Sequence, residues 1–298
     1  MGRYVFMNKF VKSFLMVSFL TYAFAGLAFA EDNTSIQAGN SGSMAANGQK
    51  HYMGCIPPSK EKLSLFPKAA APQGIKVPSK IDLSANFPTP GNQGQQGSCV
   101  GWATAYNYKT FQEKLDHKWD VKTNDHKFSP AYVYNQINGG RDQGSSIDDA
   151  MNLIKNQGVC SLQAMPYSDR NYTKRPTAAQ KKLALPHKSK SWGVTNGGDV
   201  NAMKAHLAAG DAVTVGIPIY SDFDRISSSN PVYHGTGGGL EGYHALCIVG
   251  YDDSKKAFKF INSWGANWGI NGYGYMGYDF IQRENITGYI MTDVPEGK

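Results

Sequence analysis

The chain has 298 residues, a length that fits one large domain or two small ones. Hydrophobic residues make up 41% and charged residues 18%, which excludes a disordered protein, a collagen, a coiled coil and a protein that spans a membrane many times. Three of the basic residues lie in the first 30 positions, so the remainder carries 27 basic against 23 acidic residues. This weak excess argues against a nucleic-acid partner.

The first 30 residues have the pattern of a secretory signal peptide. A basic start is followed by an apolar, uncharged run from Phe14 to Ala30 that ends in Ala-Phe-Ala. The run is short for a membrane anchor, so we expect cleavage after Ala30. The mature protein is then secreted or periplasmic, without an integral membrane segment, in a compartment where disulfides persist.

Residues 31–78 precede the main domain and divide into two parts. Positions 31–50 are rich in Ser, Gly, Asn and Gln and are predicted to be flexible. Positions 51–80 carry apolar side chains among prolines and are predicted to pack on the body of the protein, with a short helix starting at Ser59. We therefore expect residues 31–78 to be a pro-region or an N-terminal strap, ahead of a domain at 79–298.

The main domain changes from helical to strand patterns along its length. Helical spacing of apolar residues predicts helices at Cys99–Leu115, Pro130–Ile137, Ile147–Asn156 and Met203–Ala209. Apolar stretches separated by Gly, Asn and Asp predict strands at Val213–Tyr220, Tyr243–Tyr251, Ala257–Asn262, Tyr273–Tyr278 and Ile286–Val294. Helices followed by strands indicate an α+β fold of two lobes, with a site in the cleft between them.

Cys99 is a candidate nucleophile. It lies at the start of the helix predicted at Cys99–Leu115, directly after a run of small residues and glutamines. The dipole and the unpaired N–H groups of a helix N-terminus stabilise a thiolate, which is the nucleophilic form of cysteine. The alternative is a small buried apolar residue, the commoner fate of a cysteine.

Two polar residues at strand ends give this cysteine possible partners. His244 opens an apolar strand, where it is placed to act as a base, and Asn262 ends the next strand, where it is placed to accept an imidazole N–H. Each residue alone is better explained by packing or by a turn. The three residues together are more specific than each one alone. His244 follows Cys99 by 145 residues and Asn262 follows it by 163, which is close to the order and spacing at which a catalytic cysteine is followed by its histidine and asparagine.

The chain resembles the papain-like cysteine peptidase family from Ile81 to its C-terminus. The resemblance rests on three blocks: Gln93–Ala103, His244–Tyr251 and Asn262–Gly274, the last with the motif Asn-Ser-Trp-Gly. It implies a papain-like fold, with a helical N-terminal lobe, an antiparallel β C-terminal lobe and the active-site cleft between them. It also implies a thiol peptidase that acts on peptide or protein substrates, and we expect a monomer.

The resemblance assigns catalytic roles to matching residues. Cys99 is the nucleophile, His244 its base and acid, and Asn262 the residue that orients the imidazole. Gln93, six residues before Cys99, forms the oxyanion hole with the Cys99 N–H. The resting state expected from the family is a Cys99 thiolate beside a protonated His244.

Four further residues are expected to shape the substrate site. Gly144 and Ser145 lie in a loop that resembles the one that pairs with substrate backbone. Ala245 resembles a wall of the pocket for the second residue before the cut, and Trp264 resembles the shield over the catalytic imidazole.

The chain departs from the family pattern at several positions. Val100 stands where the family has an aromatic residue, Gln96 where it has a cysteine, and Ser145 where it has a second glycine. Residues 31–78 are too short for the long helical propeptide of the plant and animal enzymes, so any inhibition by this segment uses a shorter device. We hypothesise that the segment lies across the cleft as a short propeptide that inhibits the domain; the alternative is a structural strap far from the site. These departures point to a divergent, bacterial, secreted branch.

The remaining cysteines leave two interpretations. Cys247 alternates within an apolar strand, as a buried thiol does, and Cys99 must stay free to act. We hypothesise a disulfide between Cys55 and Cys160 that pins the N-terminal segment to the helical lobe. The alternative is two unpaired thiols.

The sequence predicts no metal and no cofactor. His206 lies in a predicted helix and His234 before a Gly-rich loop, and neither has a partner at a metal-ligand spacing. Gly237–Gly242 satisfies G-x-G-x-x-G but precedes a strand rather than a helix, which argues against a nucleotide site.

Two alternatives to a peptidase remain open on the same residues. A thiol acyltransferase or amidase would use the same catalytic groups and differ only in its access to water. A catalytically inactive binding protein would keep the fold, although the joint presence of Cys99, His244, Asn262 and Gln93 argues against it. The loop at Asp222–Leu240 is long enough to block one end of a cleft, so endopeptidase and exopeptidase are both possible.

Overall fold

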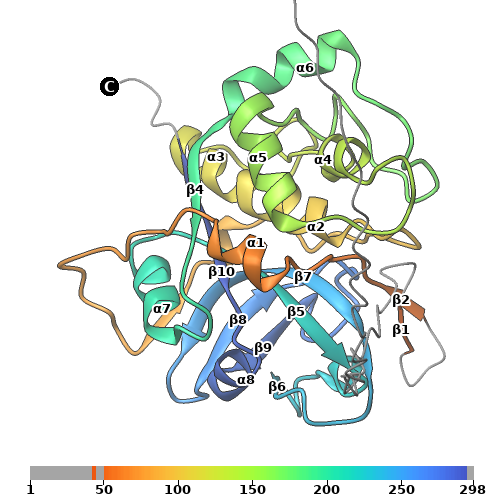
Figure 1. The fold of residues 1–298 in the computed structure, drawn as a ribbon. Helices are drawn as coiled ribbons and strands as arrows, with labels where there is room; N and C mark the ends of the chain where they lie inside the picture. The colour runs from red at the N-terminus through yellow and green to blue at the C-terminus, as the bar shows by residue number, and fades with distance from the viewer. Residues whose placement is uncertain (1–41, 45–49, 294–298) are drawn as a thin grey trace, which may run out of the picture. The chain divides into compact units, whose positions relative to one another are not determined.

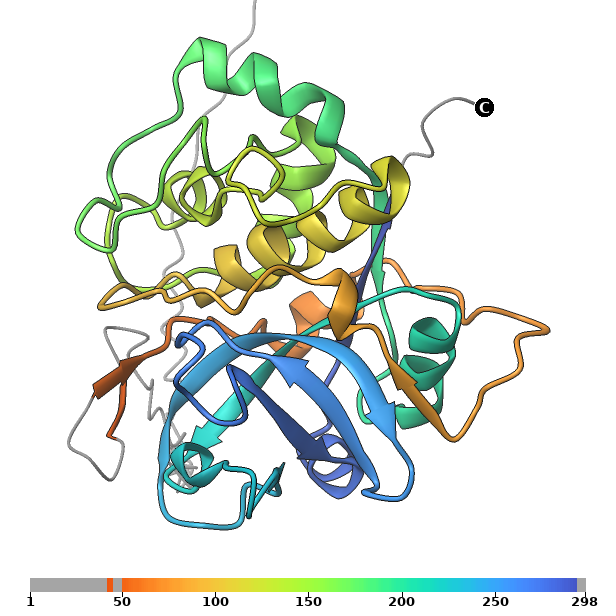
Figure 2. The ribbon, with the colours of Figure 1, turned by 180° about the vertical axis from the view of Figure 1, so that it is seen from behind.

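A helical lobe lies against a lobe of strands in the computed structural model (Figure 1, Figure 2). The structure describes residues 42–44 and 50–293, which all fall within the unit Ile36–Lys298. The predicted signal peptide and most of positions 31–50 lie outside the described residues. Among the helices that are described, none has the length and apolar character needed to cross a membrane.

The helical lobe is built around the helix that begins at Cys99. This helix runs without interruption through α2 (Cys99–Gly101), the π-helical stretch η2 (Trp102–Lys109) and α3 (Thr110–His117). The other helices of this half of the chain are α1 (Lys60–Ser64), η1 (Ser84–Asn86), α4 (Pro130–Ile137), α5 (Ile147–Gln157), α6 (Ala178–Ala184) and η3 (Leu185–His187). The helices predicted here are therefore confirmed.

Serine and threonine caps explain where several of these helices begin. Ser59, Ser129 and Ser146 each accept a hydrogen bond from a backbone N–H in the first turn of α1, α4 and α5. Thr177 forms a reciprocal capping box with Gln180 at the start of α6, a helix that was not predicted.

The strands form an eight-stranded sheet in the order β4-β10-β5-β7-β8-β9-β6, with β3 paired to β7. Its members are β3 (Lys80–Asp82), β4 (Ser189–Val194), β5 (Val213–Tyr220), β6 (Val232–Tyr233), β7 (Leu240–Asp252), β8 (Ala257–Ile261), β9 (Tyr273–Gly277) and β10 (Gly288–Asp293). The pairings are antiparallel except for that of β6 with β9. A separate pair joins β1 (Gly42–Met44) to β2 (Lys50–Tyr52).

The predicted strands are present with shifted ends, and two helices accompany them. α7 (Val200–Ala208) starts three residues before the predicted Met203. The short η4 (Phe223–Arg225) lies in the loop after β5. β9 stops at Gly277 because α8 (Tyr278–Arg283) begins there, so the expectation that Tyr278 ends a strand is wrong.

Strand β7 is buried on both faces and divides the interior into two cores. Ala245, Cys247 and Val249 point toward the core shared with the helices, whereas Leu246 and Ile248 join the core on the opposite side of the sheet. This alternation follows from the two-residue period of a strand. The arrangement confirms the predicted α+β fold of two lobes, and it places His244 at the lobe boundary.

Candidate active site

Cys99 is the first residue of α2 and is fully buried. Its Sγ accepts a hydrogen bond from the backbone N–H of Ala245 at 3.4 Å. Ser98, which precedes it, does not cap the helix, because its hydroxyl is hydrogen-bonded to that of Tyr167 at 2.7 Å. The amides of the helix start are therefore left for the thiol and for a group bound to it.

His244 and Asn262 meet because β7 and β8 are antiparallel neighbours, with Cys247 opposite Ile261. The imidazole Nε2 lies 2.8 Å from Oδ1 of Asn262. An amide oxygen only accepts, so Nε2 carries the hydrogen and Nδ1 keeps its lone pair. Nδ1 is buried and has no hydrogen-bond partner among the described residues, and the next residue, Ala245, contacts the thiol of Cys99.

Trp264 covers the imidazole as predicted. Its ring stacks on His244 with centroids 4.6 Å apart and planes inclined by 29°. Both side chains are buried, so the bond from His244 to Asn262 is shielded from water. Shielding of this kind strengthens a hydrogen bond, because the local dielectric is low.

Gln93 is fully buried and is held at both ends of its amide. Its Nε2 donates to the carbonyl of Gln96 at 2.9 Å, and its Oε1 accepts from the hydroxyl of Ser263 at 2.6 Å. The second hydrogen of Nε2 is left for a ligand. Ser263 was missed by the sequence analysis, although it stands inside the Asn-Ser-Trp motif.

The protonation state differs from the expected ion pair. Burial raises the pKa of the Cys99 thiol to about 12, and the hydrogen bond from the Ala245 amide opposes only part of this rise. Burial also lowers the pKa of His244 to about 4, against the smaller upward effect of Asn262. Both groups are therefore neutral at neutral pH in this structure. A segment from the N-terminal part of the chain lies close to both groups, since Cys55 is near enough to Cys99, and His51 to His244, for their charges to interact.

The covering segment consists of residues 50–58, called here the cleft segment. Figure 1 shows it in orange between the helical lobe and the sheet. Its backbone makes a parallel bridge between Cys55 and Ser145: Ser145 N–H donates to Gly54 O at 2.9 Å, and Ile56 N–H donates to Ser145 O at 2.9 Å. Gly54 and Cys55 N–H both point at the carbonyl of Tyr243, at 3.3 and 3.1 Å.

The cleft segment comes very close to the residues before Cys99. Gly54 has φ +144°, and a Cβ at this position would lie 2.2 Å from the carbonyl oxygen of Gly97. A Cβ on Gly144 would lie 2.3 Å from the carbonyl oxygen of Gly54. Glycine at both positions therefore lets two backbones approach each other.

The residues of the cleft segment before Gly54 pack around Trp264. Met53 is fully buried in the core that contains Trp264. Trp264 donates from Nε1 to the carbonyl of Tyr52 at 2.8 Å, and His51 stacks on the indole at 4.6 Å. His51 is in turn paired with Asp224 at 2.8 Å. The indole is thus held between two imidazoles, His51 of the segment and His244 of the site.

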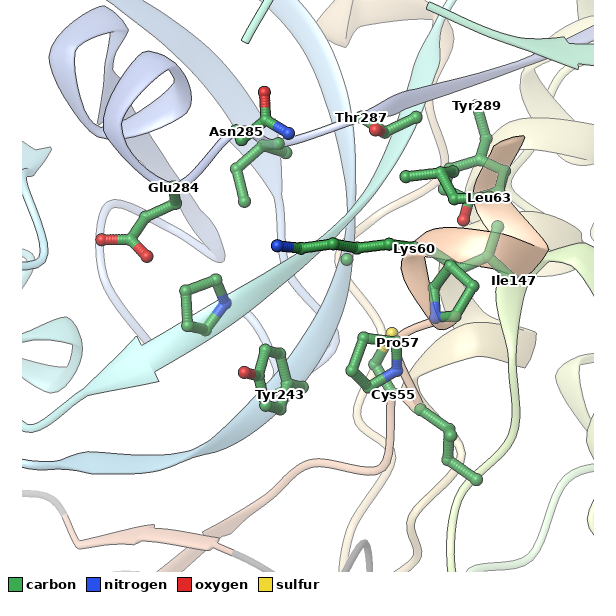
Figure 3. Close-up of a pocket in the computed structure, with 15 residues that line it drawn as sticks. Cys55, Pro57, Lys60, Leu63, Ile147, Tyr243, Glu284, Asn285, Thr287 and Tyr289 are labelled. Carbon is green, nitrogen blue, oxygen red and sulfur yellow. The ribbon is translucent and has the colours of Figure 1, made fainter. Parts of the chain in front are cut away.

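Two cavities remain beside the segment. One, of about 320 Å³, is lined by residues that include Cys55, Pro57, Lys60, Tyr243 and Glu284 (Figure 3). The other, of about 560 Å³, is lined by His51, Trp264 and Asp224. The cleft segment contributes Cys55 and Pro57 to the first cavity and His51 to the second. Asp224 belongs to the long loop that was expected to border one end of the cleft.

The predicted disulfide between Cys55 and Cys160 is wrong. All four cysteines are free. Cys55 lies in the cleft, where its Sγ would be 2.8 Å from a Cβ on Gly216. Cys160 lies beside the start of α4, where its carbonyl oxygen accepts a hydrogen bond from the backbone N–H of Ser129. The disulfide was inferred from the number of cysteines alone, which does not show whether two thiols lie close together in the fold.

The other predicted substrate-site residues assemble around the cleft segment. Ser145 pairs with it through its backbone, and Gly144 provides the close approach. Ala245 is buried opposite Gly216 in the pairing of β5 with β7. Tyr243, whose carbonyl holds the segment, was missed because a backbone acceptor leaves no signal in the sequence.

Comparison with known proteins gives a consistent result. The model of the papain family of cysteine proteases matches residues 77–292. Cathepsin B-like CP3 of Giardia intestinalis is 30% identical over 222 residues, which cover 69% of this chain and 72% of that protein. An uncharacterized peptidase C1-like protein, L477, of Acanthamoeba polyphaga mimivirus is 27% identical over 216 residues and is covered to 66% of its length.

Solved structures with the same fold include a bacterial enzyme. Xylellain, a cysteine protease from Xylella fastidiosa, has a TM-score of 0.70 and 25% identity, and the match covers 85% of this chain and 98% of that chain. A procathepsin B from Trypanosoma congolense matches with a TM-score of 0.66 at 19% identity, over 82% of this chain and 87% of that chain, which indicates the fold. The family match over most of the chain and the agreement of the fold lead to one conclusion: the chain belongs to the papain family of cysteine proteases.

Proposed function

We propose that this peptidase is a secreted member of a bacterial branch that hydrolyses peptide bonds through Cys99 and His244. One observation carries the assignment. The hydrogen bond from His244 Nε2 to Asn262 leaves Nδ1 without a partner among the described residues, next to the residue whose amide holds the Cys99 thiol. A nucleophile, a base and a group that orients the base are therefore adjacent.

The proposed reaction starts when the proton moves from Cys99 Sγ to His244 Nδ1. The thiolate attacks the carbonyl carbon of the substrate, and negative charge develops on the carbonyl oxygen. The Cys99 N–H and the second hydrogen on Gln93 Nε2 stabilise this charge. His244 gives its proton to the leaving amine, and water activated by His244 then hydrolyses the thioester.

Peptide is the proposed substrate class because the cleft already binds a peptide. Ser145 and the carbonyl of Tyr243 pair with the backbone of the cleft segment. A substrate backbone would use the same donors and acceptors. This favours a peptidase over an amidase for small molecules or an inactive homologue.

We also propose that residues 31–78 form a pro-region that inhibits the domain at 79–298 through the cleft segment. Two effects support inhibition. The segment occupies the backbone partners that a substrate needs, and its burial of Cys99 and His244 keeps both groups neutral.

Peptide mapping by mass spectrometry tests the proposed function. The wild-type chain and Cys99→Ala are incubated with a diverse peptide pool under mild reductant, with Cys247→Ala as the control for loss of a buried thiol. We expect internal cleavages with wild type and Cys247→Ala only. If no folded form cuts any peptide, including one that lacks residues 31–75, the peptidase assignment is overturned. Trimming confined to the peptide ends would indicate an exopeptidase.

A further inference from the structure

A cluster of potential metal ligands lies at the far end of the helix that begins with Cys99. Glu113 and His117 occupy successive turns of α3, and His187 comes from η3. Oε2 of Glu113 lies 3.0 Å from Nε2 of His117 and 2.9 Å from Nδ1 of His187. The three ligand atoms lie within 4.8 Å of one another.

These distances are close to those of a tetrahedral zinc site. Bonds of about 2.0–2.1 Å at tetrahedral angles separate neighbouring ligand atoms by about 3.3 Å. The two distances from the Glu113 oxygen to the imidazole nitrogens therefore need to grow by about 0.3–0.4 Å to admit an ion. The two imidazole nitrogens, which lie within 4.8 Å of each other, must also come to about this separation. Small rotations of side chains supply such movement.

The charge around the cluster favours a cation. Lys109 binds Oε1 of Glu113 at 2.7 Å and Asp293 at 2.7 Å, so it leaves Oε2 free to face the imidazoles. Two carboxylates against one lysine leave a net negative charge beside the imidazoles when these are neutral.

Aromatic packing holds the imidazoles in position. Trp119 stacks on His117 with centroids 4.1 Å apart and planes inclined by 11°. The edge of Phe128 meets His187 at 4.8 Å. Glu113 itself is buried, with 4% of its surface exposed. The donor set is thus arranged in advance and partly shielded from water, as an ion of this class requires.

We propose that Glu113, His117 and His187 bind a Zn²⁺-like transition-metal ion that joins α3 to η3. Two imidazoles and one carboxylate suit Zn²⁺, and a fourth position stays open for water. The site lies on the order of 20 Å from Cys99, because 14 residues of helix separate Glu113 from it. The ion therefore serves the fold of the helical lobe and takes no part in the chemistry of Cys99.

The three proposed ligands are too far apart in the sequence to reveal the site. Glu113 and His117 have the four-residue spacing of a helical ligand pair, but a pair alone is too common to indicate a metal. The third ligand, His187, follows 70 residues later and approaches only through the fold of α6 and η3.

Metal titration of the untagged Cys99→Ala chain at pH near 7.5 tests the proposal. This background removes the catalytic thiol as a competing ligand. We expect one equivalent of Zn²⁺ by calorimetry, and for Co²⁺ we expect visible absorption without an intense thiolate charge-transfer band. His117→Ala and His187→Ala should each weaken binding by at least about tenfold.

His126→Ala is the matched control. Like His117, His126 stacks on Trp119, with ring centroids 4.7 Å apart, but it is not one of the three proposed metal ligands. It should bind Zn²⁺ like its parent. His187→Gln serves as a second variant, since it keeps the side-chain volume near the surface of η3. Absence of stoichiometric uptake, or uptake unchanged in both His187 variants, overturns the site.

Discussion

Replacing Gly54 with alanine is expected to activate the enzyme. Gly54 has φ +144°, which disfavours any L side chain, and a Cβ there would overlap the carbonyl oxygen of Gly97. The substitution strains only the closed form, because the strain disappears once the cleft segment leaves Cys99. A mutation that destabilises the closed state should therefore increase activity.

The magnitude follows from the contacts of the segment. Its four backbone hydrogen bonds to Tyr243 and Ser145 stabilise the closed form by about 2–6 kcal/mol at about 0.5–1.5 kcal/mol each. A non-glycine residue in a sparsely populated backbone region costs about 1–3 kcal/mol. Gly54→Ala should thus raise the open population roughly 5- to 140-fold, since about 1.4 kcal/mol is tenfold. The overlap with Gly97 adds to this effect.

The assay is the rate at which iodoacetamide alkylates Cys99, followed by peptide mass spectrometry. It measures access to the thiol and does not depend on knowing the substrate. Gly74→Ala is the matched control, because Gly74 also has a positive φ, of +70°, but has no atom within 4 Å of its Cβ position. Equal rates for wild type, Gly54→Ala and Gly74→Ala would refute the inhibitory role of the cleft segment.

Three further predictions concern charge. Ultraviolet difference spectra against Cys99→Ala should show no thiolate in wild type at about pH 6–9, because burial raises the pKa of Cys99 to about 12. Gly54→Ala should gain the thiolate absorption. Equal spectra for wild type and Gly54→Ala would contradict this prediction. In the Gly54→Ala background, Gln93→Ala should lower turnover per titrated site by about 10²–10³, and an unchanged rate removes Gln93 from the oxyanion hole. Lys109→Met should cost about 3–5 kcal/mol in urea unfolding, because the buried carboxylate of Glu113 and the half-buried carboxylate of Asp293 lose their cation. A loss below about 1 kcal/mol would argue against that pairing.

The catalytic residues were predictable because each carries a local signal. Cys99 begins a helix, Asn262 directly follows β8, and the motif after Asn262 contains the stacked Trp264. His244 lies inside β7, which begins at Leu240, so the expectation that it opens a strand is wrong. The sheet then needs only antiparallel pairing of neighbouring strands to bring the histidine and the asparagine together.

The sequence suggested a segment across the cleft, but the contacts that hold it were not predictable in the same way. It is held by backbone atoms of Tyr243 and Ser145, and a carbonyl acceptor is the same in every residue type. Gly54 and Gly144 did mark it, but a glycine that permits close approach looks in sequence like a glycine in a turn. The expected ion pair failed for the same reason, since the burial that makes Cys99 and His244 neutral comes from a distant segment.

In the proposed inhibition, the cleft segment blocks access to Cys99 and at the same time keeps Cys99 and His244 uncharged. In the closed form the pKa of His244 is near 4 and that of Cys99 is near 12. At any pH between these values the Cys99–His244 pair carries one titratable proton, which is on the sulfur. A thiolate beside an imidazolium also holds one proton. Opening therefore leaves the number of protons on this pair unchanged, so titration of the pair itself gives the balance between the forms no pH dependence near neutrality. We infer that departure of the segment, and not titration of Cys99 or His244, switches this enzyme on.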